Sequence, residues 1–258
     1  MRAVESIWYR NFLTHLGMTK GRYGQSLEQS TTGKKLNHLS DGPADMAYAL
    51  SLRNKLDQSE QYQQNIGSGK SLLSASESAL NGVLTRMYQV ITLAEQGASD
   101  TSEGEGREVL ATQVEAVRDA LLDLGNTEVL GRFLFSGSAS DTTPFVKQAD
   151  TSETLPDGRV ITVPGDVVYQ GNSDVVQIQA DFSLKVDVGI PGDQAFGIGE
   201  GRIDIFAHLQ KMVRDLRADD TTALGQDISI MHEVVGQLND VIGVCGNGTA
   251  QLNEVLGQ

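Results

Sequence analysis

The stretch TTALGQDISIMHEVVGQLNDVIGVCGNGTAQLNEVLGQ, residues 221–258, carries the clearest repeat in this sequence. Its seam positions follow one another in alternating steps of four and three: Leu224, Ile228, Met231, Val235, Leu238, Ile242, Cys245, Thr249, Leu252 and Leu256. This spacing predicts a long helix that packs against other helices along its whole length. Cys245 falls on the seam, so we expect a small buried hydrophobic residue there and not a reactive thiol.

Three further segments show helical spacing. Residues 44 to about 100 repeat apolar side chains every seven positions, at Ile66, Leu73, Leu80, Met87 and Ala94. After the glycine-rich turn at 97–106, Leu110, Val114, Val117, Leu121 and Leu124 predict a second helix that folds back antiparallel on the first. A shorter helix is predicted from residue 205 to 216, and residues 219–222 break it before the C-terminal repeat. Asp215, Asp219 and Asp220 form an acidic cluster near this break, which we interpret as solvated surface.

Between residues 140 and 200 the spacing of apolar residues changes from the helical repeat to every second position, as in a β-strand. Val176, Ile178 and Ala180 alternate with polar residues, and Leu184, Val186 and Val188 do the same. Asp181 and Phe182 lie between these runs, so they predict a β-hairpin with one buried face.

Together these patterns predict a mainly α fold with a small β domain: a long antiparallel helical bundle or coiled-coil rod with a strand-rich insertion at its tip. We divide the chain into an N-terminal assembly helix at 1–40, a discontinuous helical rod at 41–135 and 201–258, and a β-rich outer domain at 136–200.

The first forty residues predict an amphipathic helix that needs a partner. Its apolar residues are Ile7, Trp8, Phe12, Leu16, Tyr23 and Leu27. Gly17, Gly21 and Gly24 each cost about 1 kcal/mol relative to alanine in a helix, so this helix is weak alone. We take the six apolar residues as a candidate assembly interface and expect residues 1–40 to be mobile in the isolated protein; the alternative is ordinary packing inside the monomer. Residues 37–43 break the helix, and Ser40 or Asp41 is expected to cap the next one.

Composition argues against several classes of function. The net charge of −14 and pI of about 4.6 repel phosphate backbones, so no nucleic-acid partner is expected. A single cysteine cannot form an internal disulfide, and no apolar run reaches the ~18 residues of a membrane helix. The N-terminus also lacks the continuous apolar stretch of a secretory signal peptide.

Motifs for chemistry are equally lacking in the sequence. Ser30 to Lys35 suggests a phosphate loop, but Glu28 and Lys35 stand where that loop needs glycine and Ser or Thr. The four histidines are scattered without the spacing of metal ligands. We therefore expect no enzyme activity, no cofactor and no metal site.

Several stretches resemble a known family. LEQSTTGKKLN (27–37), SDGPAD (40–45) and ALSLR (49–53) resemble the N-terminal signature of the bacterial flagellin family. MRAVESIWYRN (1–11), GRFLFSGSASDTTPF (131–145), VYQGN (168–172) and GIPGDQAFG (189–197) resemble its hook-associated branch, whose members join the hook to the filament. The resemblance covers nearly the whole chain, and such stretches in this order are a specific combination.

This resemblance implies a structural adaptor of the flagellum that works by binding. The implied partners are the first hook-associated (junction) protein, flagellin, further copies of the chain in a ring layer, and a flagellar export chaperone. The implied location is extracellular, reached through the flagellar type III channel without a cleaved signal and without membrane insertion. In this family the C-terminal helix continues past the region matching Leu238–Leu256 and pairs with the N-terminal helix. Here the heptad pattern is still running at Gln258, so we expect that pairing segment to be missing from this chain.

Three alternatives stay open at this stage. Flagellin shares the terminal signature and would be a filament subunit, although GRFLFSG and PGDQAFG argue against it. An enzyme or ligand-binding module in the β domain would need a convergent polar cluster. A type III needle or translocator component would rarely carry such a β insertion.

Overall fold

The structure is a computed structural model, and it describes residues 2–35, 37, 42–99, 104–129, 131–199 and 201–257, without the side chains of residues 2–6. The chain divides into two compact units, Met1–Gln61 and Tyr62–Gln258. Each unit is described by itself below.

The first unit is helical. Helix α1 spans Arg2–Thr32, and Gly33 follows it with a φ of 68° while its amide donates to the carbonyl of Gln29. Glycine tolerates this left-handed conformation, which is a common way to end a helix. The next helix, α2, begins at Pro43 and runs to Ala98, so its first part belongs to this unit. The predicted caps Ser40 and Asp41 lie outside the described residues.

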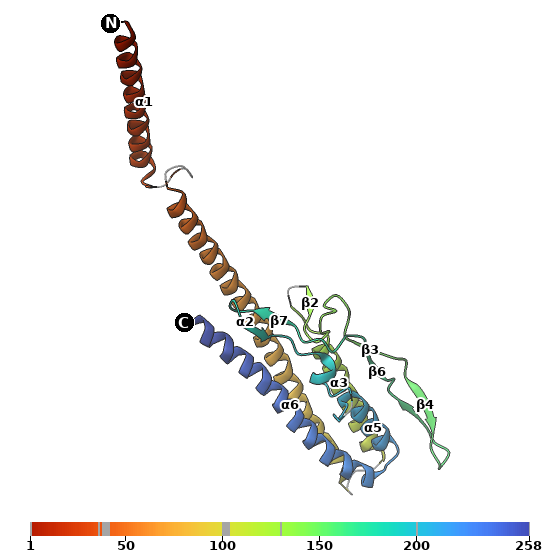
Figure 1. Cartoon of the computed structure of the whole chain (residues 1–258). Helices are drawn as coiled ribbons and strands as arrows, with labels where there is room; N and C mark the ends of the chain where they lie inside the picture. Colours follow the sequence, from red (N-terminus) through yellow and green to blue (C-terminus); the bar gives the residue numbers. More distant parts are fainter. Residues whose placement is uncertain are drawn as a thin grey trace. The chain divides into compact units, whose positions relative to one another are not determined.

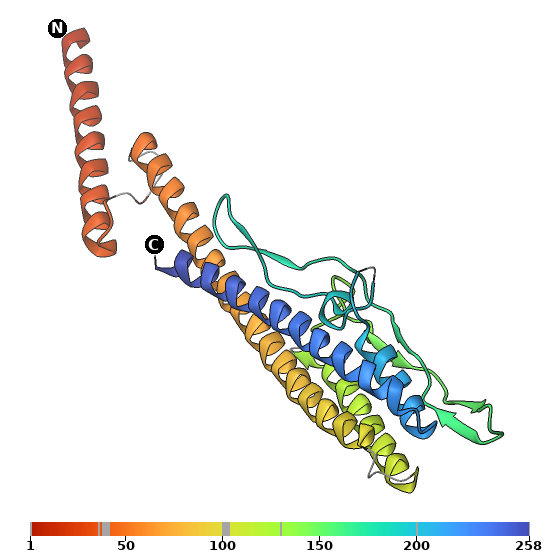
Figure 2. The ribbon, with the colours of Figure 1, turned by 90° about the horizontal axis from the view of Figure 1, so that it is seen from below.

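The second unit is built on four helices that lie side by side (Figures 1 and 2). They are the rest of α2, α3 (Gly104–Gly125), α5 (Ile205–Arg217) and α6 (Thr221–Leu256). Leu124 lies against Gly82 and Leu110 against Gly97, so α3 runs antiparallel to α2 as predicted. The mainly helical fold class with a small β domain is confirmed.

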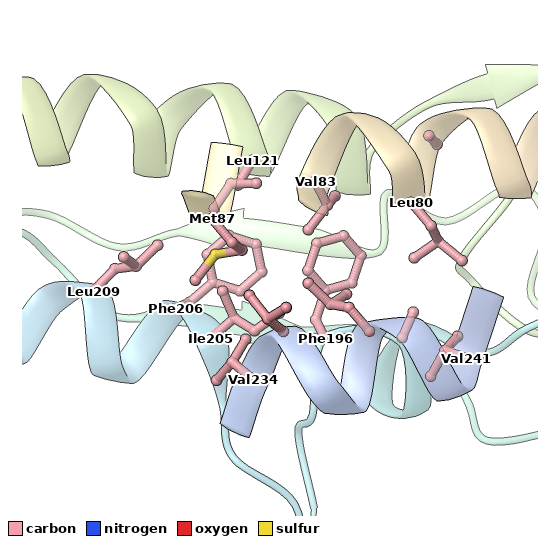
Figure 3. Close-up of a cluster of buried hydrophobic side chains, with 14 of the residues drawn as sticks. Leu80, Val83, Met87, Leu121, Phe196, Ile205, Phe206, Leu209, Val234 and Val241 are labelled. Carbon is pink, nitrogen blue, oxygen red and sulfur yellow. The ribbon is translucent and has the colours of Figure 1, made fainter. Parts of the chain in front are cut away.

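The predicted seam residues form the core between these helices. Figure 3 shows ten labelled members of the cluster, contributed by α2, α3, α5, α6 and the segment before α5: Leu80, Val83, Met87, Leu121, Phe196, Ile205, Phe206, Leu209, Val234 and Val241. All ten are buried. Cys245 is buried as well, in agreement with its position on the seam.

The strands form four separate two-stranded antiparallel sheets. The pairs are β1 (Glu128–Val129) with β2 (Arg132–Phe133), β3 (Phe145–Lys147) with β6 (Val167–Tyr169), β4 (Thr151–Thr154) with β5 (Val160–Val163), and β7 (Gln177–Gln179) with β8 (Lys185–Asp187). Ile178 pairs with Val186, which confirms the predicted hairpin. Because each sheet has two strands, it depends on packing against helices for stability.

The interpretation of the acidic cluster as solvated surface is wrong for Asp215, which is buried, whereas Asp219 is half-buried and Asp220 is exposed. Asp215 is buried beside Lys211. Asp219 pairs with Arg107 and Arg159, which come from distant parts of the sequence. Asp220 caps α6 by accepting a hydrogen bond from the amide of Ala223. Helix ends and buried cations need oxygen acceptors. The three aspartates supply such acceptors around the turn between α5 and α6.

Candidate assembly surface

The six predicted interface residues all lie on α1 with exposed side chains. Their exposed fractions range from 52% to 75%, for Ile7, Trp8, Phe12, Leu16, Tyr23 and Leu27. We call these six residues the α1 stripe. Exposed apolar side chains gathered on one helix are typical of surfaces that bind a partner.

The α1 stripe is organised by helical spacing. The rings of Trp8 and Phe12, one turn apart, are stacked with their centroids 6.5 Å apart. Leu16 follows after a further four residues, so these three side chains occupy one face of the helix. Gly17, Gly21 and Gly24 have open space where a side chain would begin. A partner helix could therefore approach the backbone of α1 closely.

A second exposed apolar group lies at the start of α2 and was not singled out from the sequence. Its members are Tyr48, Leu50, Leu52 and Leu56, with exposed fractions from 42% to 67%. In the rest of α2 the apolar residues Ile66, Leu73 and Leu80 are buried. The sequence pattern alone could not distinguish the exposed from the buried apolar residues of α2. It shows their helical spacing but not whether another element packs against them.

Charge is distributed unevenly along the chain. Residues 1–40 contain six Lys or Arg and two Asp or Glu, whereas the other residues contain 14 and 32. The segment that carries the α1 stripe is therefore basic within an acidic protein. This asymmetry favours acidic partners for the stripe region and makes association sensitive to salt.

The second unit has several surface hollows. Among the described residues, none of these hollows is lined by a cluster of side chains arranged for catalysis. One hollow of about 360 Å³ beside α6 is lined by Leu73, Val241 and Val244, with Asp187 and Asp240 also in its wall. The thiol of Cys245 is buried, and burial raises its pKa to about 11. A thiol with such a raised pKa is a poor nucleophile at neutral pH. No described helix is long and apolar enough to cross a bilayer.

Three of the motif stretches meet at Tyr169. Its hydroxyl group lies 2.9 Å from the carbonyl oxygens of Phe135 and Asn172, and it accepts a hydrogen bond of 3.1 Å from the amide of Gly192. The aromatic rings of Phe145, Phe196 and Phe206 pack nearby, with centroids 4.7 to 5.3 Å apart. These three stretches therefore hold the sheets against the helices. They do not include the α1 stripe, which lies in a different part of the sequence.

Comparison with known proteins defines the class. The profile of the bacterial flagellin N-terminal helical region matches residues 6–140, more than half of the chain. The chain therefore belongs to the bacterial flagellin family.

The particular relatives that match most of its length are named flagellar hook-associated protein 3. The protein of this name from Escherichia coli K12 is 25% identical over 99% of this chain and 81% of its own length. That from Salmonella typhimurium LT2 is 27% identical over 76% of this chain and 57% of its own. A crystal structure of flagellar hook-associated protein 3 from Legionella pneumophila has the same fold, with a TM-score of 0.69 and 16% identity over 81% of this chain and 94% of that one. Curated flagellins match a shorter part, between 45% and 54% of the chain.

Proposed function

We propose that this chain is a structural adaptor of the bacterial flagellum that joins the hook to the flagellin filament. The observation that carries the proposal is the α1 stripe, a set of exposed apolar side chains on a helix of a flagellin-family protein. The relatives that match most of this chain are named hook-associated protein 3. The proposed adaptor acts by binding its neighbours. Burying an apolar side chain at such an interface contributes about 0.8 kcal/mol of binding free energy per CH₂ group. A ring of copies would repeat that contribution at each interface.

The partners proposed for the chain follow from this role. They are the first hook-associated protein on the hook side, flagellin on the filament side, neighbouring copies in one ring layer, and an export chaperone before assembly. A location outside the cell, reached through the flagellar export channel, fits the same role. We propose that the N-terminal 40 residues form the assembly region, residues 41–135 and 201–258 the rod, and residues 136–200 the outer domain.

The α1 stripe can be tested by placing charge on it. Phe12→Asp with Leu16→Asp should leave cells with hooks but without attached filaments, and flagellin should accumulate in the medium. The matched control is Asn11→Asp with Ser26→Asp, which adds the same charge at exposed polar positions of α1. Electron microscopy and an immunoblot of the medium give the result. Normal filaments in the stripe mutant would contradict the assignment.

Flagellin itself is the second candidate, because the matching profile is that of the flagellin N-terminal region. Self-assembly separates the two proteins. A flagellin extends into long filaments from seeds, whereas a junction protein should add a single layer. Growth of this chain into long filaments would replace the adaptor proposal with the flagellin one.

A further inference from the structure

Lys211, Asp215 and Asp227 form a charge cluster between two helices, in which both carboxyl groups are buried and the Lys211 side chain is 42% exposed. Lys211 and Asp215 lie one turn apart on α5, and Asp227 lies on α6. The Lys211 Nζ atom is 2.7 Å from Asp215 Oδ2 and 2.7 Å from Asp227 Oδ1. This single ammonium group therefore connects the two helices through two short ion pairs.

The cluster carries more negative than positive charge. Asp215 is 4% exposed and Asp227 is 0% exposed. The two carboxyl groups are within hydrogen-bonding reach of each other. The second oxygen of Asp227, Oδ2, has no hydrogen-bond partner among the described residues. Two ionised carboxylates would leave one uncompensated charge in the protein interior, which is unfavourable.

A second cation, Arg214, also pairs with Asp215, but its shorter contacts are with Glu153. Arg214 on α5 reaches Asp215 Oδ1 only at 3.9 Å, because its guanidinium binds Glu153 of β4 at 2.8 Å. Asp220, before α6, acts on Arg214. The charged groups that act on Asp227 itself are Lys211 and Asp215.

The protonation of Asp227 follows from this environment. Burial raises the pKa of Asp227, Lys211 opposes this rise, and the neighbouring Asp215 adds to it. The pKa stays above its ordinary value on balance. Folding therefore favours the protonated form of this carboxyl group.

We propose that Lys211, Asp215 and Asp227 form a proton-controlled latch that tightens the α5–α6 hairpin on acidification. A proton taken from solvent by Asp227 lets its hydroxyl donate to Asp215. The cluster then holds one cation, one anion and one neutral acid, and the unpartnered oxygen gains a hydrogen bond. Loss of that proton returns the excess negative charge to the interior and loosens the hairpin.

The direction of the pH effect is fixed by linkage. Because the pKa of Asp227 is higher in the folded than in the unfolded chain, its stabilising contribution is fully present below the unfolded value. The contribution is lost as the pH rises through the folded value. The protein contains many other carboxyl groups, whose titration also changes its stability with pH. The contribution of Asp227 is therefore measured as the difference in stability between a variant and the parent chain at each pH.

The Asp227→Asn variant mimics the protonated acid, since its amide can donate to Asp215 and its oxygen can accept from Lys211. We expect a melting temperature at pH 7 that is higher than that of the parent chain by roughly 2–4 °C. This advantage should shrink as the pH falls through the raised pKa of Asp227, because the parent chain then carries the proton itself. Asp240→Asn, at an exposed position of α6, is the control and should shift the melting temperature equally at each pH. An Asp227→Asn difference that does not change with pH, or a loss at pH 7, would overturn the proposal.

The Lys211→Met variant tests the same latch from the cation. It leaves two carboxyl groups facing each other without an ammonium group between them, so the melting temperature should fall at pH 7. Acidification should restore more of the lost stability in this variant than in the parent. Hydrogen exchange of the α5 and α6 amides should follow the same order. An equal deficit from pH 7 to pH 4 would mean that Lys211 does not share its site with a titrating carboxyl group, and would overturn the proposal.

Discussion

The hydroxyl group of Tyr169 lies 2.9 Å from the carbonyl oxygen of Phe135, and this contact ties β6 to the segment that follows β2. The same oxygen accepts a hydrogen bond from the amide of Gly192, at the start of α4 (Gly192–Ala195). The Tyr169 ring packs on Phe145, with the centroids 5.2 Å apart. A single phenol therefore joins backbone from three stretches that are far apart in the sequence.

Removal of this hydroxyl should weaken the second unit without changing its fold. Tyr169→Phe keeps the ring contact with Phe145 and loses the hydroxyl contacts with Phe135, Asn172 and Gly192. We expect the free energy of unfolding to fall by about 1 kcal/mol, measured by urea unfolding. Tyr88→Phe is the matched control, since Tyr88 is exposed on α2 and its hydroxyl can stay hydrated. Equal stability of both variants would show that the Tyr169 hydroxyl contributes nothing to stability.

The phenol of Tyr169 should also ionise only at a pH well above the ordinary value for tyrosine. Burial raises the pKa of Tyr169 to about 12. Because the pKa is raised in the folded state, the stabilising contribution of the neutral phenol is complete below the ordinary value near 10 and is lost as the pH rises through about 12. An absorbance titration of tyrosinate should show one late step that Tyr169→Phe removes and Tyr88→Phe retains. A titration without a late step that Tyr169→Phe removes would contradict this prediction.

Two glycines of α2 should respond oppositely to alanine. A Cβ atom at Gly69 would lie 2.5 Å from Ile178 Cδ1 and 2.9 Å from Val188 Cγ1, so these side chains, or the hairpin segment that carries them, would have to shift away from α2. We expect Gly69→Ala to destabilise the protein by roughly 1–3 kcal/mol. At Gly67 nothing lies within 4 Å, and alanine there should stabilise the helix by about 0.5–1 kcal/mol. Chemical unfolding of the two variants side by side measures both changes. A gain in both would show that the hairpin does not pack on α2.

The helices of this fold could be predicted from the sequence because each is determined by residues that lie close together in the chain. Leu73, Leu80 and Met87 recur at one face of a helix, and the structure buries all three. The break after α5 was also visible in the sequence at residues 219–222, although the capping role of Asp220 was not recognised there. In both cases the residues that decide the structure lie within a few turns of each other.

The remaining structure depends on pairs that are distant in the sequence. Phe145 of β3 pairs with Tyr169 of β6 across the intervening β4–β5 hairpin, and a two-residue period does not specify that partner. The burial of Asp215 depends on Lys211 and on Asp227 of the next helix. The candidate interface residues were found by their apolar spacing, but the exposed residues at the start of α2 were missed because the same spacing occurs in buried helices.

The aromatic cluster should dominate the stability of the second unit. Phe196 is 0% exposed and contacts Phe135, Phe145 and Phe206. We expect Phe196→Ala to cost about 3–5 kcal/mol, because it removes a buried ring and leaves a cavity. Phe182→Ala is the control: this ring is 81% exposed after β7, and its removal should change the free energy of unfolding by less than about 0.5 kcal/mol. Similar losses in both would mean that the Phe182 ring is covered in solution.

The amides of α1 should exchange with solvent much faster than those of α3 in the isolated protein. The α1 stripe is exposed, and an isolated helix gains little stability without a packed face, whereas α3 buries Val114, Val117 and Leu121 in the core. Hydrogen exchange followed by mass spectrometry should show peptides from residues 7–32 deuterated at the first time point and peptides from residues 110–124 still protected. The measurement should be repeated at several protein concentrations, because self-association would cover the stripe. Protection of α1 that is independent of concentration would mean that the stripe packs within the monomer, and the assembly surface would then have to lie elsewhere.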